Sequence, residues 1–181
     1  IGSRISPEAT QAAKQAADFL AAAGHEIIEI PYPVDGAALI RSYYQMNGAE
    51  TTAMMNSIQQ GLGRPIRKEE IEPFSWTMHQ FGQKIPAATY VHSLQLWDQA
   101  AVTMEELFQK FDLFLSPTTA FSAPKINEDL QSEHIRQRME QAAELTAAEL
   151  AELIYDYFDK SLQLTPYTQL ANLTGQTAIS L

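Results

Sequence analysis

Residues 111–120 read Phe-Asp-Leu-Phe-Leu-Ser-Pro-Thr-Thr-Ala, and the prediction of the fold starts from this stretch. Residues 112–116 form a short apolar run, which predicts a buried strand. Pro117 ends the run because proline has no N–H to donate to a β-ladder, and Thr118 and Thr119 follow it in a tight loop. Loops at strand ends often line functional sites, so Thr118 and Thr119 are candidate site residues.

An α/β unit is predicted at the start of the chain. Residues 6–8, Ser-Pro-Glu, have the composition of a helix N-terminus: a capping hydroxyl, a proline in the first turn and an acid near the positive end of the helix dipole. Small apolar residues then recur at helical spacing up to Gly24, which can end the helix. Residues 27–30, Ile-Ile-Glu-Ile, precede Pro31 and predict a strand after the helix.

Most of the remaining chain has helical periodicity. Helices are predicted over residues 35–58, 69–81, 86–111 and 127–161, the last as a solvated helical hairpin or lid. Residues 178–181 follow a glycine turn and predict a final strand. The predicted fold class is therefore α/β, helix-rich with a few strands of a mixed sheet.

The composition excludes several classes of function. There are 12 basic and 22 acidic residues, the net charge is −10, and Lys and Arg form no basic stripe, so nucleic acid is not an expected partner. Cysteine is absent, which excludes disulfides and suits a reducing, cytoplasmic compartment. No run approaches the roughly 20 apolar residues of a membrane span, so no membrane association is expected. Any export signal would lie upstream of residue 1.

The sequence contains no standard catalytic or cofactor motif. There is no Gly-x-Ser-x-Gly elbow, no phosphate-binding loop and no His-Glu-x-x-His zinc motif. The histidines, at positions 25, 79, 92 and 134, lack the spacing of metal ligands, so neither a metal nor a cofactor is expected. The alternative to an enzyme is a helical protein-interaction module, because residues 35–111 and 127–161 are largely amphipathic helix.

Several blocks, taken together and in order, resemble the amidase signature family. They are Ser6-Pro7-Glu8-Ala9, Leu20-x-x-x-Gly24-His25-Glu26, Ile30-Pro31-x-Pro33, Tyr90, residues 111–120, Ala123-Pro124 and Ala171-Asn172-Leu173-Thr174-Gly175. The resemblance covers nearly the whole chain and is strongest to the branch related to 6-aminohexanoate cyclic-dimer hydrolase. It implies the C-terminal half of the family's α/β/α domain, so residues 1–181 are expected to be a partial amidase domain.

The resemblance implies a serine amide hydrolase whose catalytic residues lie outside this chain. The family uses a serine nucleophile, a second serine in a cis peptide and a lysine base that takes the proton of the nucleophile through the second serine. Its serines lie in a glycine- and serine-rich stretch, and this sequence has no Gly-Gly or Ser-Ser pair. We therefore expect no catalytic residue in the chain and no activity of the chain alone. The exposed sheet edges of a partial domain would favour self-association.

The resemblance also implies where substrate binds. In the glutamine-using branch, an arginine on the long helix and an aspartate before the Ala-Asn-Leu block hold the charged ends of the amino acid, and these positions are Trp97 and Thr165 here. Neutral side chains there imply a small uncharged amide, because an unpaired buried charge costs about 3–5 kcal/mol. Thr118 and Thr119 complete the predicted substrate-binding set. Structural alternatives exist: Trp97 lies on a packing stripe, and Thr165, followed by Pro166, could be a cap.

Overall fold

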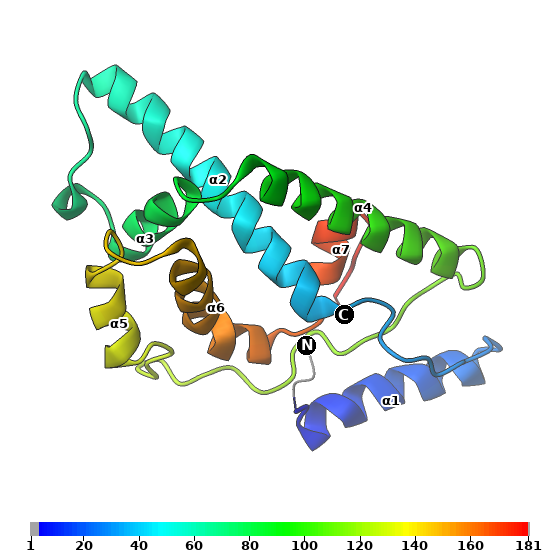
Figure 1. Ribbon diagram of the computed structural model, residues 1–181. Helices are drawn as coiled ribbons and strands as arrows, with labels where there is room; N and C mark the ends of the chain where they lie inside the picture. Colours follow the sequence, from blue (N-terminus) through cyan, green and yellow to red (C-terminus); the bar gives the residue numbers. More distant parts are fainter. Residues whose placement is uncertain (1–3, 181) are drawn as a thin grey trace. The chain divides into compact units, whose positions relative to one another are not determined.

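The computed structural model describes residues 4–180, and every regular element in these residues is a helix (Figure 1). In chain order the helices are α1 Pro7–Ala22, α2 Gly36–Leu62, the 3₁₀ helix η1 Lys68–Glu70, α3 Pro73–Gly82, α4 Ala87–Phe108, α5 Glu133–Glu140, α6 Ala147–Leu164 and α7 Gln169–Thr174. The chain divides into two compact units. The first unit contains the residues up to Leu39, Trp97–Glu128 and the residues from Ser161 onward, and the second contains Ile40–Leu96 and Asp129–Lys160.

The predicted α/β fold with a mixed sheet is wrong, because residues 4–180 contain no strand. The three predicted strands, at 27–30, 113–116 and 178–181, are irregular segments, except that Leu181 lies outside the described residues. A strand requires a neighbour that exchanges backbone hydrogen bonds with it, and no β-ladder joins these runs in the part of the chain that the structure describes. The apolar composition is present, but the pairing that would make a sheet is not.

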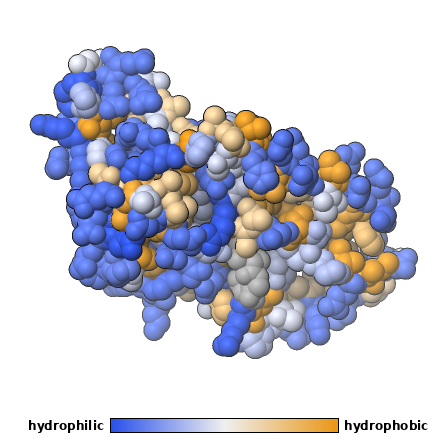
Figure 2. Space-filling view, viewed as in Figure 1, coloured by the Kyte–Doolittle hydropathy of each residue, from blue (hydrophilic) through white to orange (hydrophobic). Residues whose placement is uncertain are grey.

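Apolar side chains of the irregular segments are exposed instead of packed in a sheet. Ile28 has 54% of its surface exposed, Leu113 has 74% and Ile179 has 85%. Figure 2 shows hydrophobic residues interrupting the hydrophilic surface on the face that it presents. Self-association of the chain stays a prediction, and it now depends on exposed apolar side chains and not on strand edges.

Local capping explains why the first two long helices begin where they do. Ser6 Oγ accepts a hydrogen bond of 3.2 Å from the Ala9 N–H at the start of α1. Asp35 Oδ1 accepts bonds of 3.0 Å from the N–H groups of Ala37 and Ala38 at the start of α2. Such side chains satisfy N–H groups that the first helical turn leaves without partners. The Ser6 cap agrees with the sequence-based prediction.

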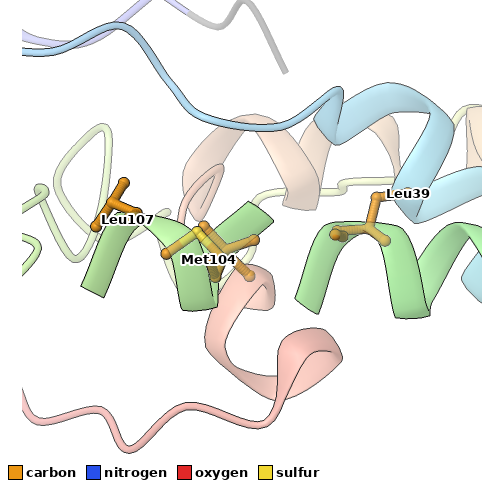
Figure 3. Packing of buried hydrophobic residues seen from close by; sticks show 5 residues of the cluster. Leu39, Met104 and Leu107 are labelled. Atoms are coloured by element: carbon orange, nitrogen blue, oxygen red, sulfur yellow. The ribbon is translucent and has the colours of Figure 1, made fainter. Parts of the chain in front are cut away.

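The first unit has an apolar core to which α2, α4 and α7 contribute. Its buried members are Leu39, Ala100, Met104, Leu107 and Leu170. Figure 3 shows Leu39 of α2 beside α4, which carries Met104 and Leu107. Partly buried aromatic side chains, among them those of Tyr32 and Phe114, pack against this cluster. The core therefore brings residues near 32 and 114 to the same place, although they are far apart in sequence.

The second unit is packed by aromatic and aliphatic side chains. The rings of Tyr44 and Phe158 stack with their centroids 5.0 Å apart, and those of Phe74 and Tyr157 stack at 4.3 Å. Ile154 on α6 is fully buried, with 0% of its surface exposed. Burial of large rings and branched aliphatic side chains supplies most of the stabilisation in a helical unit of this kind.

His79 is a buried titratable side chain in α3 of the second unit. Only 5% of the residue is exposed, and its Nε2 lies 2.8 Å from Gln83 Nε2. Its Nδ1 is buried and has no hydrogen-bond partner among the described residues. Burial disfavours the charged imidazolium and lowers the pKa of His79 below its ordinary value. The folded chain therefore favours the neutral ring.

We expect the chain to lose stability as the pH falls from 7 to 5. Because the pKa of His79 is lower in the folded chain than the unfolded value of about 6.5, the unfolded chain takes up the proton first. The contribution of neutral His79 to the free energy of unfolding is complete above the unfolded pKa of about 6.5 and decreases as the pH falls below it. Thermal unfolding at pH 7, 6 and 5 measures the loss. His79→Gln removes the titration, so a loss of the same size in this variant would contradict the assignment.

The carboxyl of Glu70 titrates outside this window. Hydrogen bonds from Arg64 and then from Arg67 lower the pKa of Glu70 to about 2. The unfolded carboxyl has a pKa of about 4.3, so this group reduces stability only at lower pH. Measurements between pH 5 and 7 therefore separate His79 from Glu70.

Candidate functional site

Ala120 holds three segments of the first unit together at the candidate site. It is completely buried, with 0% of its surface exposed. Its N–H donates a hydrogen bond of 2.8 Å to the carbonyl of Leu164 at the end of α6, and its carbonyl accepts one of 2.8 Å from the Ser6 N–H. Satisfied buried backbone groups of this kind define the position of a loop that has no regular structure. The loop at 117–120 is therefore anchored.

The bond from Ala120 to Leu164 brings two of the predicted substrate-binding residues together. The Ala120 N–H belongs to the peptide group that follows Thr119, and the Leu164 carbonyl belongs to the peptide group that precedes Thr165. A hydrogen bond between these groups makes Thr119 and Thr165 spatial neighbours. Thr119 is exposed and Thr165 is partly buried. The family resemblance predicts that Thr119 and Thr165 belong to one substrate site, and the Ala120–Leu164 hydrogen bond joins the segments that carry them.

Thr118 is linked to the last described segment of the chain. Its Oγ1 lies 3.1 Å from Ser180 Oγ, and either hydroxyl can donate. Both residues are exposed. Ser180 could not be singled out from the sequence, because residues 178–181 predicted only a strand. No local signal marks this contact, since the partners are 62 positions apart.

Thr165 makes local hydrogen bonds where α6 ends. Its Oγ1 donates to the Ser161 carbonyl at 3.3 Å and accepts from Gln169 Nε2 at 3.4 Å. These bonds agree with the structural alternative that Thr165 shapes the end of a helix. Gln169 Oε1 is buried and has no hydrogen-bond partner among the described residues. Gln169 is thus a second polar side chain beside Thr165, and no feature of the sequence marked it.

Trp97 lies on α4 and packs against the apolar core of the first unit. It is only partly buried. This position agrees with the packing role that the stripe on the long helix predicted. The substrate-binding role of Trp97 stays a prediction, as do those of the three threonines.

Tyr32 contributes a neutral phenol close to the same region. Its ring centroid lies 5.7 Å from that of Tyr167 and 6.5 Å from that of Phe114. Burial, with a smaller contribution from Tyr167, raises the pKa of Tyr32 to about 12. The phenol is therefore protonated at neutral pH. Tyr167 lies between Thr165 and Gln169 in sequence, so this part of the unit presents neutral hydroxyl and amide groups.

Two surface cavities lie in the second unit and do not include the predicted site residues. One, of about 330 Å³, lies between α5 and α6 and is lined partly by His134, Arg138 and Asp156. The other, of about 500 Å³, is lined partly by Asn56 and Pro65. Within residues 4–180, no three side chains of the metal-binding types are grouped to hold an ion. None of the helices in these residues combines the length and the hydropathy that a membrane span requires.

Comparison with known proteins gives a family match and several relatives. Residues 2–181 match the sequence profile of the family described as Amidase. The chain is 35% identical over 183 residues to a lipoamidase from Enterococcus faecalis, covering 99% of this chain and 25% of that protein. It is 24% identical to 6-aminohexanoate-cyclic-dimer hydrolases of Paenarthrobacter ureafaciens and Pseudomonas sp. (strain NK87), covering 98% of this chain and 34% of each of them. The chain thus spans about a quarter to a third of the length of these relatives.

A solved structure shares the fold. It is described as the structure of 6-aminohexanoate cyclic dimer hydrolase complexed with substrate, and it matches with a TM-score of 0.61 and 22% identity. The match covers 87% of this chain and 33% of that one. At this identity the likeness concerns the fold alone.

Proposed function

The chain belongs to the amidase family, and we propose that it forms part of the substrate site of a longer serine amide hydrolase that acts on a small uncharged amide. In this proposal the chain is the C-terminal half of the amidase domain, and residues 127–161 form its solvated hairpin or lid. Family membership supports amide hydrolysis as the reaction. The type of nucleophile, the substrate and the position of the chain in the domain are parts of the proposal.

The gathering of neutral hydroxyl groups around the Ala120–Leu164 bond is the observation that carries the proposal. This bond makes Thr119 and Thr165 neighbours, and Thr118 contacts Ser180. Hydroxyls both donate and accept hydrogen bonds, so they suit the carbonyl and N–H of an amide and give no ion pair to a charged group. A neutral amide therefore loses less than a zwitterion on entering such a site.

The relatives suggest a suitable probe for this proposal. Two of them are named as hydrolases of the cyclic dimer of 6-aminohexanoate. A cyclic dimer of an amino acid has its amine and carboxylate joined in amides, so it carries neither charge. We propose that amides of this uncharged kind are substrates of the full-length protein.

We expect the full-length protein to hydrolyse an uncharged amide and residues 1–181 alone to show no turnover. Amide hydrolysis by this class needs an activated serine and a base, and the proposal places both outside the chain. Amine release from the same amide, measured for both proteins at equal concentration, makes the comparison. Turnover by residues 1–181 that is abolished when one of their own serines is replaced by alanine would contradict the proposal.

A helical protein-interaction module is the second candidate function. The exposed apolar side chains among residues 4–180 favour it. The two functions differ in what a site variant does. If Thr165→Ala changes the kinetics of amide hydrolysis by the full-length protein, the enzyme is supported; if amide turnover is absent and a partner protein binds the chain, the module is supported.

A further inference from the structure

In the second unit, α5 is anchored by fewer buried side chains than α6. Within the eight described residues of α5 only Met139 is buried. On α6, Leu150, Leu153 and Ile154 are buried, with exposed fractions of 0%, 5% and 0%. Burial of apolar side chains supplies most of the free energy that keeps a helix in place. Local detachment should therefore cost less free energy for α5 than for α6.

The space between α5 and α6 is incompletely filled. A cavity of about 330 Å³ lies there, lined partly by Ile135 of α5 and Leu153 of α6. Arg138 of α5 and Glu149 of α6 also line it, and their Nη2 and Oε1 atoms are 4.0 Å apart, which is longer than a hydrogen bond. Side chains that border a void lack part of the dispersion contacts of a close-packed interior. The interface of α5 with α6 is therefore loosely packed.

The hydrogen bonds of Arg136 do not attach α5 to its neighbours. Its Nη2 contacts the Asp129 carboxylate and donates a bond of 3.1 Å to the Gln131 carbonyl. Both partners lie just before α5 in the same segment, so these bonds move with it. At the start of this segment, Lys160 Nζ of α6 donates to the Asp129 carbonyl at 3.3 Å. Residues 129–140 are thus a unit with its own internal bonds.

Lysine side chains from two other elements bind the C-terminal end of α5 and the turn after it. Lys68 of η1 donates a bond of 2.7 Å to the Glu140 carbonyl and pairs with the Glu140 carboxylate. Lys84, which follows α3, donates to the Leu145 carbonyl at 2.5 Å and to the Ala143 carbonyl at 3.2 Å. The last carbonyls of a helix lack intrahelical donors and form the negative end of its dipole, so an ammonium group suits them. Lys68 therefore holds α5 itself, and Lys84 holds the turn that follows.

We propose that residues 129–140 form a strap that opens from the second unit while α6 stays in place, and that Lys68 is the latch that keeps it closed. The inference rests on the proposed function, because it states which part of the proposed lid, residues 127–161, moves. Opening breaks both contacts of Lys68 with Glu140 and withdraws Met139 from its buried position. It exposes the face of α6 that lines the cavity, so access to this cavity depends on the latch (Figure 1).

Hydrogen–deuterium exchange of the full-length protein at pH 7, read by mass spectrometry, tests this inference. In the wild type, backbone amides of α5 should exchange faster than those of residues 150–154 in α6. Lys68→Met keeps most of the apolar stem and removes the ammonium group. It should speed the exchange of α5 by about 3–10-fold and leave α6 unchanged. Lys110→Met removes an exposed lysine of the first unit and should change neither helix.

Salt provides a second readout of the latch. Raising the sodium chloride concentration from about 0.05 M to about 1 M screens the ion pair of Lys68 with Glu140, so the exchange of α5 should accelerate in the wild type. The acceleration should be smaller in Lys68→Met, which has no ion pair to lose.

Two results would overturn the inference. One is a wild-type α5 that exchanges as slowly as α6. The other is an acceleration by Lys68→Met that is equal in α5 and α6, because it would show a general loss of stability and no separate opening of the strap. The measurement needs no substrate. A full-length protein that hydrolyses no amide would therefore remove the proposed function, while the exchange rates would still decide whether α5 opens.

Discussion

Replacing Gly82 with alanine should destabilise the second unit by about 3 kcal/mol or more, because the added methyl group has no space. A Cβ at Gly82 would lie 1.9 Å from the Gly48 carbonyl oxygen and 2.3 Å from Thr52 Oγ1. The first contact is with backbone, so it cannot be relieved by rotating a side chain. Only a displacement of α2 from α3 would make room, and this would disturb the packing between the two helices.

The contact between α2 and α3 is equally close at Gly48 of α2. A Cβ at Gly48 would lie 2.8 Å from Phe81 Cδ1, and Thr52 Oγ1 donates a hydrogen bond of 2.9 Å to the His79 carbonyl. The two glycines thus allow α2 and α3 to approach, and the threonine connects them. This explains why glycine is present in two helices where alanine would have the better intrinsic propensity.

Gly61→Ala is the matched control for Gly82→Ala. Gly61 is in α2, and a Cβ there would meet nothing within 4 Å. The substitution should therefore stabilise the chain by about 0.5–1 kcal/mol through helix propensity. Urea unfolding of the two variants and the wild type, followed by circular dichroism, gives the free energies. If Gly82→Ala unfolds at the same urea concentration as the wild type, α2 and α3 do not approach as closely at Gly82 as the structure describes.

Helices could be predicted from the sequence because their signals are local. Ser6 and Asp35 lie within three residues of the N–H groups that they cap. The repeat of apolar residues along residues 86–111 likewise needs no knowledge of distant segments. The third helix was placed from residue 69, but residues 68–70 form a separate 3₁₀ turn and α3 begins at Pro73. Ile71 and Glu72 have extended backbones and Pro73 occupies the first turn of α3, so the 3₁₀ turn and the helix are separate.

Strands could not be predicted in the same way because pairing is not local. The run at 27–30 has the right composition, but Ile27 is 45% exposed and Ile28 is 54% exposed. A β-branched run forms a strand only when another segment supplies its hydrogen bonds and covers its apolar face. The composition of residues 113–116 led to the same mistake. The composition of each segment indicated its preference for extended structure, but it did not indicate whether another segment would pair with it.

The candidate site was predicted in part for the same reason. Proline and two threonines after an apolar run marked the loop at 117–120 locally. The contacts of Thr118 with Ser180 and of Ala120 with Leu164 join positions 62 and 44 residues apart, and no motif encodes them. Gln169 and Tyr32 were missed because glutamine and tyrosine in a single sequence have no feature that separates a site residue from a surface or core residue.

The full-length protein should hydrolyse an uncharged amide with a kcat/KM at least about 100-fold higher than that for free glutamine. Glutamine is a zwitterion, and the proposed site, with Trp97 and Thr165, offers no ion pair to either charge. Leaving one charge unpaired on burial costs about 3–5 kcal/mol, and each 1.4 kcal/mol corresponds to a factor of ten. A neutral amide avoids this cost. Kinetics with glutamine and with the cyclic dimer of 6-aminohexanoate measure the ratio.

Variants that introduce charge at Trp97 and Thr165 should reduce the ratio of kcat/KM for the uncharged amide to kcat/KM for glutamine. Thr165→Asp supplies a partner for the ammonium group of glutamine, and Trp97→Arg supplies one for its carboxylate. Glutamine turnover should therefore rise relative to the neutral amide in Thr165→Asp and rise further in the double variant. The gain should be small, since the surrounding residues do not orient the new side chains. Thr165→Ser and Trp97→Phe keep the site neutral and are the controls. Because Trp97 also packs on the apolar core, Thr165→Asp is the more informative change. A wild-type enzyme that prefers glutamine would show that Trp97 and Thr165 do not set the charge of the substrate.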